Sequence, residues 1–133
     1  MEKVYLDWSN IEALVDCLAL NIKLSNCPPS YISGLPRGGL IPAIMLSHKL
    51  NIPFIPLSLI ESVPTVDILI VDDIADSGET LESYRKYNTA VLHYKIQSEH
   101  IPTYYGMEVP DDIWISYPWE ENDAEAIQNY KIQ

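Results

Sequence analysis

The stretch ILIVDDIADSGETL, residues 68–81, constrains the fold more than any other part of the chain. It starts with four apolar residues, a pattern typical of a parallel strand that is covered on both faces. Two adjacent acids, Asp72 and Asp73, follow the apolar run, and Gly78 permits the sharp turn that comes next. In open parallel sheets, ligands bind beyond the carboxyl ends of the strands. The stretch therefore predicts a buried central strand with a binding site at its carboxyl end.

The rest of the sequence alternates between helical and strand patterns. A capping box of Ser9 and Glu12 is expected to open the first helix. Helices are expected at residues 9–22, 40–50, 78–87 and 121–130. Strands are expected at residues 31–35, 52–60, 67–71, 89–96 and 112–117. This alternation predicts an α/β fold with a mostly parallel twisted sheet flanked by helices on both faces, and the length predicts a single domain, residues 1–133.

Composition excludes several classes of partner. The formal net charge of −11 would repel the backbone of a nucleic acid, so no nucleic-acid partner is expected. No apolar run approaches the roughly 20 residues of a membrane span, and the first ten residues are not expected to act as a signal peptide. A cytoplasmic location is expected, where Cys17 and Cys27 would be reduced thiols rather than a disulfide.

Residues 76–80, DSGET, combine features of a phosphate site. Backbone amides at the start of a helix bind anions, and Ser77 and Thr80 add hydroxyl donors. Asp72 and Asp73 would repel a phosphate, but they suit the vicinal hydroxyls of a sugar or a magnesium ion. A sugar phosphate satisfies both halves of the pattern. Two alternatives remain: acids that merely end a strand and cap a helix, and a receiver-type domain with acids at its strand ends.

The same stretch resembles the phosphoribosyl-diphosphate signature of type I phosphoribosyltransferases. The resemblance implies that Asp72 and Asp73 bind the ribose hydroxyls, directly or through Mg²⁺. It also implies that Asp76 manages the proton on N7 of a purine. The 5′-phosphate would lie on the loop formed by Asp76, Ser77, Gly78, Glu79 and Thr80.

A second glycine turn, SGLPRGGLIPA at residues 33–43, carries Arg37 between a strand and a helix. Arg37 can bind phosphate oxygens through two hydrogen bonds, and Gly38 and Gly39 let backbone amides approach the same anion. Alone, the turn is equally well explained as a strand–helix connection. It resembles the pyrophosphate loop of the xanthine-guanine branch of the family. That resemblance implies a catalytic role for Arg37 and a cis peptide between Pro36 and Arg37.

The base end of the site is predicted from Lys95 and from the segment DDIWISYPWE, residues 111–120. A lysine at a strand end is commonly solvated, and tryptophans such as Trp114 and Trp119 are most often core or lid residues. Both segments resemble parts of the purine-specific enzymes. The resemblance implies that Lys95 contacts the purine 6-oxygen, Trp114 stacks on the base and Ile115 contributes backbone contacts. Ile96 stands where those enzymes have proline after the lysine.

The resemblance as a whole implies a Mg²⁺-dependent transfer of a 5-phosphoribosyl group from phosphoribosyl diphosphate to a 6-oxopurine such as guanine, xanthine or hypoxanthine. It also implies a homo-oligomer, either a dimer or a tetramer. The segment 58–66 is short for the flexible lid of such enzymes, so a non-catalytic, nucleotide-sensing module on the same fold remains an alternative. A purely structural protein on this fold is a third.

Overall fold

The computed structural model describes residues 1–120. Its main sheet has four strands in the order β2-β3-β4-β5, and every neighbouring pair is parallel. The strands are β2 (Tyr31–Gly34), β3 (Ile68–Ala75), β4 (Asn88–Lys95) and β5 (Tyr104–Val109). The apolar run Ile68–Val71 lies in the interior with each residue fully buried. The central, two-face-covered strand predicted from this run is confirmed, and so is the parallel α/β fold.

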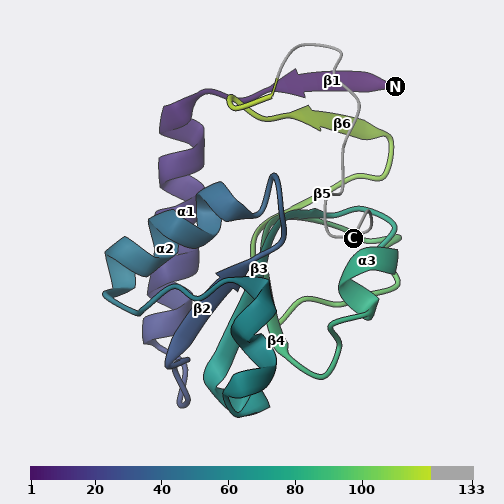
Figure 1. Cartoon of the computed structure of the whole chain (residues 1–133). Coiled ribbons are helices and arrows are strands. Elements are labelled where there is room, and N and C mark those ends of the chain that lie inside the picture. Colours follow the sequence, from purple (N-terminus) through teal and green to yellow (C-terminus); the bar gives the residue numbers. More distant parts are fainter. Residues whose placement is uncertain (121–133) are drawn as a thin grey trace.

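Two long helices, α1 (Trp8–Lys23) and α2 (Leu40–Leu50), cover one face of the main sheet (Figure 1). The helix α1 presents an apolar stripe, which includes Ile11, Val15 and Leu18, to the larger core cluster. The predicted capping box of Ser9 and Glu12 is wrong. Asp7 is the N-cap instead, because its carboxylate accepts the Asn10 amide at 2.8 Å while the Asn10 side chain accepts the Asp7 amide.

Short helical turns cover the other face, where Ile60 and Leu81 pack on the sheet in a second core cluster. They are the 3₁₀ helices η1 (Leu57–Ser62) and η2 (Thr65–Asp67), and α3 (Glu79–Glu82). The predicted strand at 52–60 is wrong. Only the bridge between Ile32 and Phe54 has strand pairing, since prolines at 53 and 56 remove two amide donors. The helix predicted at 78–87 is also too long, because α3 has only four residues.

A separate two-stranded parallel sheet joins the N-terminal strand β1 (Glu2–Tyr5) to β6 (Ile113–Ser116). Figure 1 shows this pair at the top of the view, apart from the main sheet. The sequence patterns missed β1 and β5. Both are edge strands with exposed side chains, so neither has the continuous apolar pattern of a buried strand.

Among the described residues, no helix has the length and apolar character needed to cross a bilayer. The helix predicted at 121–130 lies outside the described residues.

Candidate functional site

Asp72 and Asp73 lie near the carboxyl end of β3 and are both partly buried. The Asp72 carboxylate accepts the amide of Asp73 at 2.9 Å, and the Asp73 carboxylate accepts the amide of Ile74 at 2.8 Å. Burial raises the pKa of Asp72 well above its usual range, and repulsion from Asp73 raises it further. Burial also raises the pKa of Asp73 to about 6. A ligand that brings hydroxyl donors or positive charge therefore stabilises the ionised form of this pair.

The turn that carries Arg37 packs directly against these acids. A Cβ added at Gly38 would collide with the Asp73 carboxylate, and one added at Gly39 would lie 2.9 Å from the Asp72 Cα. The Leu35 amide donates to the Val71 carbonyl at 2.9 Å, so strand pairing holds the turn beside β3. The peptide between Pro36 and Arg37 is cis, as the resemblance implies. The Arg37 side chain is exposed, and it forms no ion pair with any residue between 1 and 120.

The loop 76–80 turns at Gly78, whose φ of 81° lies in the left-handed region that glycine adopts without strain. Within the part of the chain that the structure describes, the amides of Ser77, Gly78 and Thr80 have no hydrogen-bond acceptor. A set of unpaired amides in one turn suits an anion. Because α3 is so short, the helix dipole contributes less to this loop than the sequence pattern suggests.

The segment 97–100 packs against this loop. The Glu99 amide donates to the Ser77 carbonyl at 2.8 Å. A Cβ on Gly78 would collide with the Ser98 hydroxyl and lie 2.6 Å from the His100 amide nitrogen. Glycine is therefore required at position 78 for space as well as for its backbone angle. No sequence pattern pointed to this support, because its contacts come from backbone groups and from a turn without regular periodicity.

Lys95, the last residue of β4, is 1% exposed, so the lysine is buried rather than solvated. Its ammonium lies 3.4 Å from Asp76 Oδ1 and donates to the Asp111 carbonyl at 3.2 Å. Lys95 thus joins the loop 76–80 to the segment that leads into β6. A buried ammonium has three donors. One of them bonds to the Asp111 carbonyl, and the contact with Asp76 is an ion pair.

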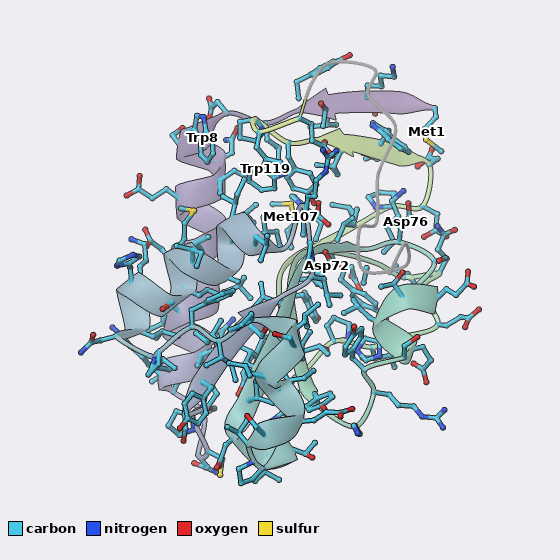
Figure 2. The ribbon with its side chains drawn as sticks, viewed as in Figure 1. Met1, Trp8, Asp72, Asp76, Met107 and Trp119 are labelled. Carbon is cyan, nitrogen blue, oxygen red and sulfur yellow. The ribbon has the colours of Figure 1, made fainter. Side chains whose placement is uncertain are left out.

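Trp114 and Ile115 lie on β6, where their Cα atoms pair with those of Lys3 and Val4. Trp114 is 42% exposed, whereas Ile115 is buried. Among residues 1–120, no hydrogen bond or ring contact joins Trp114 to the acids or to Lys95. The structure therefore gathers the two glycine turns, the acids and Lys95, and it connects β6 to them through Asp111. Figure 2 shows Asp72 and Asp76 between the main sheet and the β1–β6 pair in that view.

Tyr117 is a site neighbour that sequence analysis missed. Its hydroxyl donates to the Asp73 carbonyl at 3.1 Å and lies 2.8 Å from Nδ1 of His93. Burial lowers the pKa of His93 to about 4, so the ring is neutral at physiological pH. The Tyr117 ring stacks on Trp119 with a 4.9 Å centroid distance. No spacing rule would have paired residues 93 and 117, because the fold brings them together.

The resemblance to a known family is tested by comparison with other proteins. No family model matches the chain. A curated xanthine-guanine phosphoribosyltransferase of Cereibacter sphaeroides is 32% identical in an alignment that covers 87% of this chain and 86% of the relative. The chain belongs to the type I phosphoribosyltransferase family. It falls in the xanthine-guanine branch and is a glycosyltransferase that transfers phosphoribosyl groups to purines.

Solved structures agree with this family assignment. The purine phosphoribosyltransferase of Pyrococcus horikoshii superposes with a TM-score of 0.76 at 31% identity, covering 96% of this chain and 99% of that one. A protein of Neisseria gonorrhoeae with bound ppGpp also has a TM-score of 0.76, at 27% identity, with 92% and 91% covered. These relatives do not favour the alternative of a non-catalytic sensing module.

Phosphoribosyltransferases of this family generally use Mg²⁺. Within residues 1–120, no group of three His, Cys, Asp or Glu side chains is arranged to hold a metal ion. The adjacent carboxylates of Asp72 and Asp73 still fit a magnesium ion that takes its other ligands from the substrate, because Mg²⁺ is commonly held by one or two carboxylates together with phosphate oxygens.

Proposed function

We propose that the preferred acceptor is a 6-oxopurine, and that the two glycine turns, the acid pair and Lys95 form the active site. The observation that carries this proposal is the buried Lys95 ammonium, which lies 3.4 Å from Asp76, the first residue of the loop 76–80. A 6-oxopurine presents its 6-oxygen and N7 on the same edge. Lys95 and Asp76 would face that edge as a donor and a proton acceptor.

The phosphoribosyl diphosphate would lie across both glycine turns. Its 5′-phosphate accepts hydrogen bonds from the unpaired amides of the loop 76–80 and from the hydroxyls of Ser77 and Thr80. The Glu79 amide donates to the Ser77 hydroxyl within the same loop. Its ribose diol donates to Asp72 and Asp73. Gly38 and Gly39 lie beside these acids and offer their amides to the pyrophosphate, and Arg37 is exposed at the same turn and pairs with the phosphate charge.

In the transfer, the purine N9 forms a bond to the anomeric carbon while the bond from that carbon to the pyrophosphate oxygen breaks. The electron pair of the broken bond leaves on pyrophosphate, where Arg37 stabilises the growing charge. Asp76 accepts the proton from N7, so the purine ends neutral. Asp72 and Asp73 would hold Mg²⁺, which neutralises phosphate charge when bound. The anchored 5′-phosphate supplies binding energy remote from the reacting centre.

Base selection would depend on Lys95 and β6. An ammonium proton of Lys95 that is not bonded to the Asp111 carbonyl can donate to a 6-oxygen, whereas adenine offers an amino group there and would be rejected. Trp114 keeps an exposed indole face that can stack on a purine, and Ile115 supplies backbone contacts beside it. The ppGpp in the Neisseria gonorrhoeae structure carries a guanine base, which supports a guanine-type ligand for this fold.

We also propose a single domain over residues 1–133, a cytoplasmic location, and a dimer or tetramer without nucleic-acid or membrane partners. The net charge of −11 disfavours nucleic acid, and Tyr105 and Met107 on the edge strand β5 expose apolar surface that suits a second copy. Light scattering after size-exclusion chromatography measures the oligomer. A monomer at micromolar concentration would contradict the proposed dimer or tetramer.

The proposed acceptor is tested by measuring pyrophosphate release from phosphoribosyl diphosphate and Mg²⁺ with guanine, xanthine, hypoxanthine, adenine and uracil. Release with the 6-oxopurines alone is expected. Asp76→Asn serves as the matched control, because it keeps the shape of the side chain and removes the proton acceptor. Equal release with adenine, or release only with uracil, would overturn the assignment of the base.

A further inference from the structure

Gln97 follows β4 and has an exposed side chain to which the proposed reaction gives no role. Its Nε2 donates a hydrogen bond to Asp76 Oδ1 at 2.8 Å. The Lys95 ammonium lies 3.4 Å from the same oxygen. A hydrogen bond from Gln97 and an ion pair with Lys95 therefore meet on Oδ1, and no hydrogen bond or ion pair within residues 1–120 involves Oδ2 of Asp76.

The backbone on both sides of Gln97 is held in place. The Gln97 amide donates to the Asp111 carboxylate at 3.2 Å, and the next amide, of Ser98, donates to the Lys95 carbonyl at 3.0 Å. The Glu99 amide then donates to the Ser77 carbonyl at 2.8 Å. Because three hydrogen bonds fix the main chain around it, the Gln97 side chain reaches Asp76 from a defined position.

We propose that Gln97 is a positioning residue that holds Asp76 Oδ1 and thereby keeps Oδ2 as the oxygen that accepts the N7 proton. This inference rests on the proposed function, which makes Asp76 the proton acceptor. A carboxylate held through one oxygen presents the other in a constant orientation, and small misplacements of a reacting group slow a reaction strongly.

Lys95 does not replace Gln97 in this role. Its ammonium is shared with the Asp111 carbonyl and, during the reaction, with the purine 6-oxygen. Gln97 has no second side-chain partner among the described residues, so its amide group can remain on Asp76 throughout the reaction.

The test uses Gln97→Ala and Gln97→Glu in the full-length chain. Gln97→Ala removes the donor, and kcat is expected to fall about tenfold with the KM for phosphoribosyl diphosphate within about twofold of wild type. Gln97→Glu keeps the size but sets a carboxylate against Asp76, so its kcat is expected to be lower still. Glu99→Gln is the control, because this neighbouring exposed side chain forms no hydrogen bond or ion pair in the described part of the chain.

A double-mutant cycle with Asp76→Asn separates positioning from a general structural effect. If Gln97 acts through Asp76, adding Gln97→Ala to Asp76→Asn causes no further loss of kcat. A wild-type kcat in Gln97→Ala, or an equal tenfold loss in both backgrounds, overturns the inference.

Crystal structures of wild type and Gln97→Ala test the inference without an activity measurement. The Asp76 carboxylate is expected to change its rotamer or lose order in the variant, and an unchanged, well-ordered carboxylate overturns the inference. A wild-type protein that releases no pyrophosphate overturns the proposed function instead, so the two failures are distinguishable.

Discussion

The hydroxyl of Tyr117 donates a hydrogen bond across 3.1 Å to the backbone carbonyl of Asp73 and so ties the segment after β6 to the carboxyl end of β3. Tyr117 is 3% exposed, and its hydroxyl also bonds to the neutral ring of His93. The contact joins the two sheets at the acid pair, where the ribose is proposed to bind.

Tyr117→Phe removes both hydrogen bonds and leaves two buried polar atoms without a partner. The variant is expected to lose about 1–3 kcal/mol of unfolding free energy, which corresponds to roughly 4 °C in Tm for each kcal/mol. Thermal unfolding measures the change. Tyr105→Phe is the control, since that hydroxyl has no partner in the described residues and the side chain is 41% exposed. Equal Tm values for the two variants would contradict this account.

Asp73→Asn should stabilise the protein at neutral pH and reduce its activity. Since the folded protein holds the Asp73 proton more tightly than the unfolded chain does, protonation gives stability that is present below about pH 4 and lost as pH rises through about 6. Asparagine imitates the protonated form and can still accept the Ile74 amide. We expect a higher Tm than wild type at pH 7.5 and little difference at about pH 4.

The pH dependence of the Tm difference distinguishes this cause from simple repacking. A Tm gain of the same size at both pH values would mean that the Asp73 pKa is not raised by burial. Retained wild-type kcat/KM in Asp73→Asn would separately contradict a role for this carboxylate in ribose binding.

Gly38→Ala places a methyl group where the Asp73 carboxylate lies. The carboxylate must move, so we expect kcat/KM for phosphoribosyl diphosphate to fall about tenfold or more, with a Tm loss as well. In an Asp73→Ala background the obstacle is gone, and the same Gly38→Ala change should cost much less stability. Unfolding measurements on the four proteins of this cycle give the coupling between the two positions. Additive Tm losses would show that the close approach does not constrain Gly38.

Lys95→Met keeps the length of the buried side chain but removes its donors. A hydrogen bond from a charged group contributes about 1.5–3 kcal/mol, so the ratio of kcat/KM for hypoxanthine over adenine is expected to fall about 10- to 150-fold. Lys86→Met, an exposed lysine after α3, is the control. If the base preference is unchanged in Lys95→Met, Lys95 does not contact the base.

The central part of this fold could be predicted from sequence because the determinants are local. The apolar run 68–71 and the glycine turn at 78 specify their own conformations, and the periodicity of residues 9–22 matches α1. The chain also keeps the family pattern around Asp72, which identified the acid pair and the loop after it.

Other features depend on contacts that no local pattern records. The strands β1 and β5 are paired edges whose exposed side chains resemble loop sequence. The prediction of a longer helix after Gly78 failed because residues 83–87 continue in turns with hydrogen bonds between residues three apart, not in an α-helix. Tyr117 and Gln97 meet Asp73 and Asp76 across 44 and 21 residues of sequence, so only the folded structure shows that they belong beside the site.

The proposed active site is tested most directly by a crystal structure with Mg²⁺ and a purine nucleoside 5′-monophosphate such as GMP, the product of the proposed reaction. We expect the 5′-phosphate on the amides of the loop 76–80, the ribose hydroxyls against Asp72 and Asp73, and the 6-oxygen within hydrogen-bond distance of the Lys95 ammonium. A nucleotide bound elsewhere, with the loop 76–80 left without phosphate, would contradict the account.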